Sequence, residues 1–111
     1  GGNSVKVQWF GKGTNLHAVW DTKMIEYWNM SYLELAESAE YLSKKQIKAI
    51  EVGTLADWVD EIHEVTRKVY KSAEVGENLR YRYSYEHFDT VREQLQRGGI
   101  RLAKILNDIF A

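Results

Sequence analysis

Two side chains that can bind a metal ion, His17 and Asp21, stand four residues apart in the stretch "NLHAVWD". On an α-helix, residues i and i+4 lie one above the other on the same face, so both side chains can reach one cation. Imidazole nitrogen and carboxylate oxygen are common zinc ligands. The same spacing also suits an ordinary surface ion pair, and spacing alone does not separate these two interpretations.

The supply of further ligands limits what this pair can do. A catalytic zinc usually takes about three protein ligands, and the sequence has 3 histidines and no cysteine. His63 follows Ile62 in an amphipathic pattern, and His87 has no partner at ligand spacing, so we interpret both histidines as structural or solvent-facing. If His17 and Asp21 bind a metal, the remaining ligands come from outside this chain.

Length and charge bound the class of molecule. The chain has 111 residues, the size of one domain, and its 15 Lys plus Arg and 16 Asp plus Glu give a formal net charge of -1. The net charge therefore gives no indication that the chain binds nucleic acids or membranes through a general electrostatic attraction. No apolar run reaches the roughly 18 to 20 residues that span a bilayer, and the N-terminus has no signal-peptide pattern, so we expect no membrane partner.

A short strand precedes the metal-capable pair, and a helix carries it. Residues 5–10, "VKVQWF", alternate apolar and polar side chains, which predicts a half-buried strand that needs a partner strand. Two glycines then end the strand, and Thr14 or Asn15 can cap the next element. From Leu16 the apolar spacing becomes helical, which predicts a helix over residues 15–28.

Two shorter helices are predicted next. Residues 31–42 have a helical apolar stripe, and this helix is either separate from the first or continuous with it after a kink near Asn29. Ser43 then begins a Ser-x-x-Gln capping box, which predicts a helix that ends at Gly53.

The two remaining helices are longer. Thr54 begins another capping box, and the helix after it has the clearest apolar face of the sequence. Residues 74–83 are predicted as a loop and residues 84–110 as a helix. Gly98 and Gly99 lie inside that helix, where each glycine lowers helix stability by about 1 kcal/mol relative to Ala. This cost is tolerable if another segment packs closely there. The residues expected in the core or in helix contacts are Trp20, Trp28, Trp58, Tyr70, Leu95, Leu102 and Leu106.

These elements together predict the fold class. Four or five helices and one short N-terminal β-strand indicate an all-α helical bundle. The chain has no proline, 4 Trp and 7 Tyr, which fits a mainly helical body with an aromatic-rich interior.

The opening stretch resembles the zinc-dependent single-strand-specific nucleases of the mung bean nuclease and nuclease P-one type. Their C-terminal half carries "GGN", a short strand and then "NLHxxWD", and residues 1–21 contain these features in the same order. Further along, "DWVDEIHEVTRKVY" and "VREQLQRGGIRLAKILNDIF" are similar to two later helices of that family. The resemblance spans nearly the whole chain but only about the second half of the family's domain.

The resemblance implies an all-α fold related to bacterial zinc phospholipase C, with three Zn2+ ions in a cleft. Two ions form a close pair whose bridging hydroxide attacks the phosphorus, and the third stabilises the leaving 3′ oxygen. It assigns His17 and Asp21 to the third zinc, together with a histidine upstream of this chain, and no catalytic residue apart from metal ligands. Substrate-binding residues stay unassigned. Residues 1–111 are then the C-terminal portion of one nuclease domain, expected to be inactive without its N-terminal half.

The implied function is that of an endonuclease and 3′-nucleotidase that hydrolyses single-stranded DNA and RNA to 5′-phosphate products. The resemblance also implies a secreted or periplasmic protein. Because the apolar helix faces would lack their covering half, we expect the isolated chain to swap or self-associate. Two alternatives stay open: a phospholipase C-like phosphodiesterase on the same scaffold, and a non-catalytic helical interaction module.

Overall fold

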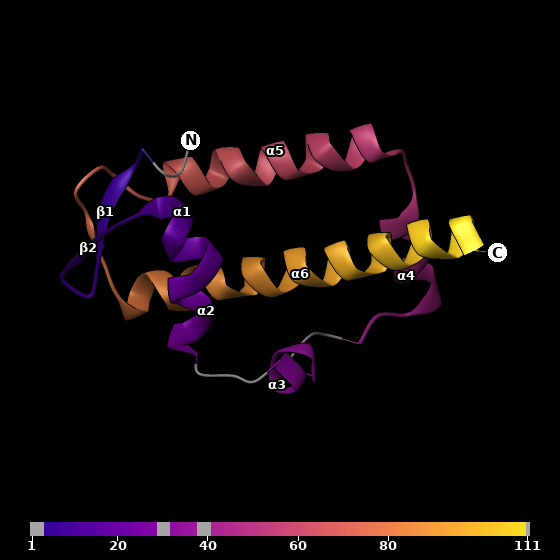
Figure 1. The fold of residues 1–111 in the computed structure, drawn as a ribbon, viewed down its shortest axis with the longest axis horizontal. Helices are drawn as coiled ribbons and strands as arrows, with labels where there is room; N and C mark the ends of the chain where they lie inside the picture. The colour runs from indigo at the N-terminus through magenta and orange to yellow at the C-terminus, as the bar shows by residue number, and fades with distance from the viewer. Residues whose placement is uncertain (1–3, 29–31, 38–40, 111) are drawn as a thin grey trace.

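The structure, a computed structural model, describes residues 4–28, 32–37 and 41–110. Two long antiparallel helices, α5 (Leu55–Lys71) and α6 (Tyr81–Phe110), run along the length of the molecule (Figure 1). A small sheet and the first helical segment cover one end of this pair, and α4 (Lys44–Glu51) lies near the other end. The chain is therefore mainly helical, which confirms the predicted fold class.

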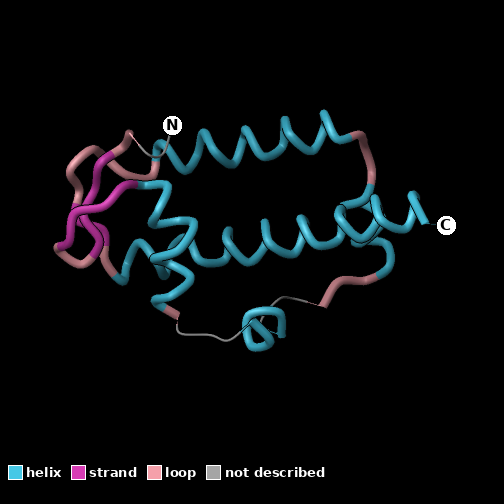
Figure 2. The backbone as a smooth tube through the Cα atoms, viewed as in Figure 1, coloured by secondary structure: helices cyan, strands magenta, loops and turns pink. Residues whose placement is uncertain are grey.

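The strand predicted over residues 5–10 forms part of a three-stranded sheet (Figure 2). β1 (Lys6–Trp9) pairs antiparallel with β2 (Lys12–Asn15) and parallel with β3 (Asn78–Leu79), so the strand order is β2-β1-β3. The partner that the short strand needs is thus supplied twice, once by its neighbour in sequence and once by a distant segment.

The predicted loop over residues 74–83 is wrong in two respects. The Gln8 N–H donates to the Glu77 carbonyl at 2.8 Å and the Phe10 N–H to the Leu79 carbonyl at 2.9 Å, which makes β3 part of the sheet. In addition, α6 begins at Tyr81 instead of residue 84. Pairing with a distant strand is a tertiary effect that the local polar composition does not reveal.

The helix predicted over residues 15–28 is present as one continuous helical segment with an irregular middle. Its three parts are α1 (Leu16–Ala18), the π-helical turn η1 (Val19–Lys23) and α2 (Met24–Tyr27). Asn15 caps this segment, since its side-chain oxygen accepts the Ala18 N–H at 2.8 Å. The π turn is the feature that the apolar spacing did not predict.

Both predicted capping boxes are confirmed. The Gln46 N–H donates to Ser43 Oγ at 3.1 Å at the start of α4, and the Asp57 N–H donates to Thr54 Oγ1 at 3.3 Å at the start of α5, each with the reciprocal bond present. α3 (Tyr32–Glu37) lies within the helix predicted over residues 31–42. The kink proposed near Asn29 lies outside the described residues.

The buried core lies at the sheet end of the molecule. It joins side chains from the sheet, the first helical segment and the first turns of α6, so this end is well packed. Its members are Val7, Leu16, Val19, Met24, Ala73, Leu79, Tyr83, Phe88 and Val91.

Several residues expected in helix contacts are exposed instead. Trp58 is buried, and Trp20 and Trp28 are partly buried, as predicted. The prediction is wrong for the four exposed residues, because the described residues leave one side of α5 and α6 uncovered. Those four are Tyr70 (40% exposed), Leu95 (50%), Leu102 (57%) and Leu106 (44%).

The glycine pair in α6 is also open. A Cβ atom built on Gly98 or Gly99 would meet nothing within 4 Å among the described residues. The close neighbour that the sequence led us to expect at these positions is therefore not supplied by the described part of the chain.

Candidate functional site

His17 and Asp21 are both exposed and line the same pocket. His17 belongs to α1 and Asp21 to η1, and the pocket between them and the long helices has a volume of about 380 Å³. The structure therefore brings the two sequence-predicted residues to one face of the helical segment, as their spacing predicts. Their side chains are open to a further partner from the solvent side.

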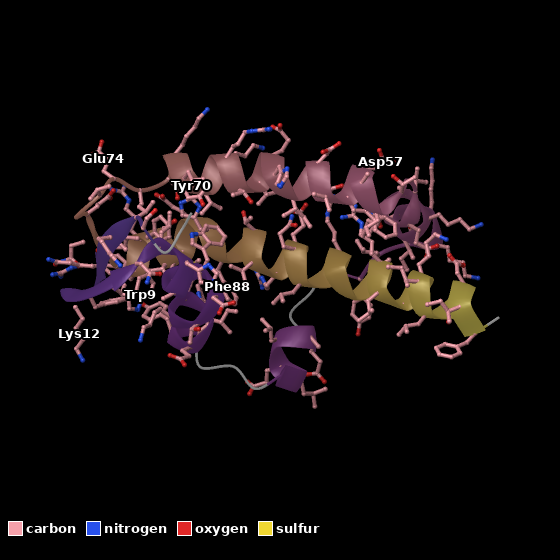
Figure 3. All side chains as sticks on the ribbon, turned by 45° about the horizontal axis from the view of Figure 1, so that its top comes forward. Trp9, Lys12, Asp57, Tyr70, Glu74 and Phe88 are labelled. Atoms are coloured by element: carbon pink, nitrogen blue, oxygen red, sulfur yellow. The ribbon has the colours of Figure 1, made fainter. Side chains whose placement is uncertain are left out.

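The pocket is mainly apolar. Its walls come from the first helical segment, from the second half of α5 and from the middle of α6. Figure 3 shows Tyr70, one of its residues, near the end of α5 that lies toward the sheet. A few polar groups in an apolar recess are the usual composition of a ligand site. The apolar residues of the lining are Leu16, Trp20, Ile25, Val65, Val69, Val91 and Leu95.

The π turn η1 begins two residues after His17 and contains Asp21. Such turns are rare and often occur at functional sites. Here the Met24 N–H bonds to the Val19 carbonyl. Four α-helical steps carry a side chain about 40° past a full turn, and the smaller rotation per π step would reduce this offset between His17 and Asp21.

The donor set fits a divalent transition metal in part. A neutral imidazole and a carboxylate suit zinc, and both side chains face one pocket. Over residues 4–28, 32–37 and 41–110, no cluster of three or more His, Asp or Glu side chains is placed to hold a metal ion. The described part of the chain thus supplies a candidate pair of ligands.

The other two histidines lie apart from this pair. His63 is exposed on α5 and does not line the pocket. The His87 ring packs against Tyr83 at 4.4 Å and against Trp20 at 5.7 Å between ring centroids. Burial lowers the pKa of His87, which favours the neutral ring. These contacts fit the structural role that the sequence suggested for His87.

A chain of hydrogen bonds behind the pair was not predicted. The Trp20 Nε1–H donates to the Tyr83 hydroxyl at 2.8 Å, and that hydroxyl lies 2.6 Å from Ser72 Oγ. Ser72 Oγ in turn donates to the Val69 carbonyl at 2.5 Å. Tyr83 is 6% exposed, and burial raises the pKa of its hydroxyl, so it stays protonated.

The direction of this chain follows from counting protons. A carbonyl only accepts, so the single Ser72 hydroxyl proton is used on Val69. The Tyr83 hydroxyl must then donate to Ser72 while accepting from Trp20. The chain therefore ties η1 to α6 and to the end of α5. The sequence could have indicated these bonds only through the general rule that a buried tyrosine hydroxyl and a buried indole N–H need hydrogen-bond partners.

A second indole bond lies beside the first. The Trp28 Nε1–H donates to Ser84 Oγ at 2.7 Å, and Ser84 is fully buried. Tyr83 and Ser84 are adjacent at the start of α6, so this one turn accepts both indoles from the segment that carries His17 and Asp21.

A mainly helical domain with a metal-capable pair beside an apolar pocket is the class that fold and site define. The sequence matches the S1/P1 Nuclease family over residues 1–111. The chain belongs to this family, which confirms the resemblance found in its motifs.

Curated relatives from Arabidopsis thaliana match nearly all of the chain. Endonuclease 2 is 29% identical over 99% of this chain and 43% of its own length. Endonuclease 3 is 32% identical over 100% of this chain and 43% of its own length, and Endonuclease 4 is 30% identical over 100% and 42%. The chain thus spans less than half the length of these relatives. None of the described helices is both long and apolar enough to cross a membrane.

Proposed function

We propose that the protein containing this chain is a zinc-dependent nuclease. It hydrolyses phosphodiester bonds of single-stranded DNA and RNA, removes 3′-phosphates from nucleotides and leaves 5′-phosphate products. The observation that carries the proposal is that His17 and Asp21 lie exposed on one pocket in a chain of the S1/P1 Nuclease family. The relatives' designation as endonucleases supports the activity.

In this proposal His17 and Asp21 are two ligands of one zinc. When bound, the metal supplies Lewis-acid stabilisation for the oxygen that leaves the phosphorus. The chain's own task is to present a neutral imidazole and an ionised carboxylate from one face of a rigid segment. Asn15 caps the start of that segment, and its buried residues anchor it to the core.

The remaining ligands are proposed to come from the part of the protein upstream of this chain. This chain covers 43% of the length of Endonuclease 2, so that relative has sequence beyond the matched stretch that could carry further ligands. The same upstream part would cover the exposed apolar side chains of α5, such as Leu55 (67% exposed), Val59 (41%) and Ile62 (49%). We propose that the isolated chain is inactive and self-associates through these residues, and that the complete protein is secreted or periplasmic.

Hydrolysis by the complete protein tests the ligand assignment. The substrates are one DNA sequence in single-stranded and duplex form, with and without zinc after chelation. Substituting His17→Ala or Asp21→Ala should lower the rate on single strands at least about 100-fold and remove close to one equivalent of zinc. His63→Ala is the matched control, because His63 is an exposed histidine outside the pocket, and it should leave both unchanged.

Three results would contradict the proposal. Full activity in His17→Ala would refute the ligand assignment. Hydrolysis of phosphatidylcholine vesicles in place of DNA would indicate the phospholipase C-like alternative. No hydrolysis of either substrate by the zinc-loaded protein would favour a non-catalytic helical module.

A further inference from the structure

We propose that Tyr83 and Ser84 are positioning residues for the metal pair. They accept the indole hydrogen bonds of Trp20 and Trp28, and in doing so they hold the π turn η1 in place. The inference rests on the metal role proposed above for the residues beside that turn. We call Tyr83 and Ser84, with their two indole bonds, the indole latch.

The position of Trp20 in the sequence links its side chain to the orientation of Asp21. Trp20 lies inside η1, between His17 and Asp21 in sequence, so a rotation that moves its indole also moves the carboxylate next to it. Its indole is fixed by the Tyr83 hydroxyl at 2.8 Å. Because that hydroxyl also donates to Ser72, the anchor joins η1 both to α6 and to the end of α5, and Tyr83 is itself buried.

The second bond explains why an irregular turn is needed. Trp28 lies eight residues after Trp20. In an uninterrupted α-helix, side chains eight residues apart point in directions about 80° apart. A π turn rotates less per residue, so it takes up part of this difference and lets both indoles face the start of α6. The two bonds of the indole latch are thus satisfied together when the segment contains η1.

If the hydroxyl of Tyr83 or of Ser84 is lost, the two indole bonds no longer have to form together, and the π turn is no longer needed for them. A partly buried indole N–H without a partner is unfavourable, so the segment rearranges to solvate it or to bond it elsewhere. An α turn is the intrinsically favoured geometry, and the segment is then free to adopt it. The direction of the Asp21 side chain would then shift relative to His17 toward the roughly 40° offset of an α-helix, which changes the geometry that the two ligands offer to one cation.

The state of the turn can be measured without metal. In the isotope-labelled complete protein, freed of metal by chelation, scalar coupling across the hydrogen bond identifies the acceptor of the Met24 N–H. In the parent chain this acceptor is the Val19 carbonyl. In Tyr83→Phe and in Ser84→Ala it should become the Trp20 carbonyl, the α-helical acceptor. If the Val19 coupling persists in both variants, the inference is overturned.

Metal affinity supplies the second measurement, on the complete protein. Competition with a chromophoric zinc chelator should show that Tyr83→Phe and Ser84→Ala each weaken one zinc site about 10-fold, the size expected when a residue that orients a ligand is lost. Tyr85→Phe is the matched control on α6, because its side chain is 77% exposed. Thr54→Ala is the stability control, since it removes the α5 cap far from the pocket. Both controls should keep the parent affinity.

The outcomes separate this inference from the proposed function. If His17→Ala loses a zinc while the latch variants bind like the parent, the metal assignment stands and the positioning role is overturned. If Thr54→Ala weakens zinc as much as Tyr83→Phe does, the effect is general destabilisation, which also overturns it. If His17→Ala retains all zinc, the proposed function itself fails, and the indole latch has no metal pair to position.

Discussion

Arg101 and Glu61 form a two-pronged ion pair between α6 and α5. Arg101 Nη2 lies 2.7 Å from Glu61 Oε2 and Nη1 lies 3.2 Å from Oε1. Arg97 Nη1 approaches the same Oε1 at 2.7 Å, and Arg101 Nε donates to the Ile50 carbonyl in α4 at 3.1 Å. Arg101, only 8% exposed, therefore joins α4, α5 and α6 at the end of the molecule that has little apolar core.

This arrangement predicts a stability that depends on pH. Hydrogen bonds from Arg101, and next from Arg97, lower the pKa of Glu61 below its ordinary value of 4.5. A carboxyl with a lower pKa in the folded state stabilises the fold above its unfolded pKa, and this contribution is lost as pH falls through the folded value. The free energy of unfolding should therefore decline as the pH drops below 4.5.

The Glu61→Gln variant isolates this effect. At neutral pH it leaves Arg101 without its counter-charge and should cost about 2 kcal/mol. At a second, acidic pH well below 4.5 the parent carboxyl becomes protonated, so the difference between parent and variant should shrink. Urea unfolding of both proteins at the two pH values measures it. An equal difference at both would mean that the Glu61 charge contributes nothing to stability.

Features set by neighbouring residues were predictable from the sequence. The capping boxes at Ser43 and Thr54 involve partners three residues away, and both form as predicted. The common face of His17 and Asp21 likewise follows from helical spacing over one turn.

Features set by distant partners were not predictable. β3 exists because β1 lies beside it, and no local pattern over Asn78–Leu79 indicates a strand. The indole N–H groups of Trp20 and Trp28 donate to Tyr83 and Ser84, more than fifty residues away in sequence. The exposed faces of α5 and α6 have a related cause. Their apolar periodicity predicts buried surfaces but does not state which segment would bury them, and the described residues leave these faces exposed.

The hairpin turn gives a prediction with an internal control. Gly11 has φ +82° and Gly13 does not adopt such a value, yet neither would place a Cβ atom within 4 Å of another described residue. Gly11→Ala should cost about 1 kcal/mol, because a Cβ is disfavoured at positive φ. Gly13→Ala should be neutral or slightly stabilising, since alanine loses less backbone entropy on folding. Thermal unfolding compares the two, and equal effects would contradict the assigned role of φ.

The apolar face of α5 gives a prediction about the upstream part of the protein. Ile62 is 49% exposed in the chain, so Ile62→Asp should change the unfolding free energy of the monomeric chain, at protein concentrations too low for self-association, by less than about 0.5 kcal/mol. In the complete protein, where we propose that Ile62 is covered, the same change would bury an unpaired carboxylate and cost about 2 kcal/mol or more. Chemical unfolding of both forms tests this. A small effect in the complete protein would show that the upstream part does not cover Ile62.

The adjacent glycines of α6 allow the sharpest comparison between chain and complete protein. Inside a helix with open space around them, Gly98→Ala and Gly99→Ala should each stabilise the chain by about 1 kcal/mol. If the upstream part packs its backbone against this site in the complete protein, the added methyl groups would clash there and the sign would reverse. Stabilisation of both forms would instead mean that the glycines serve no close packing. Since the described residues offer no neighbour at these positions, a reversed sign would point to packing supplied in the complete protein, and its size would report how closely that packing approaches.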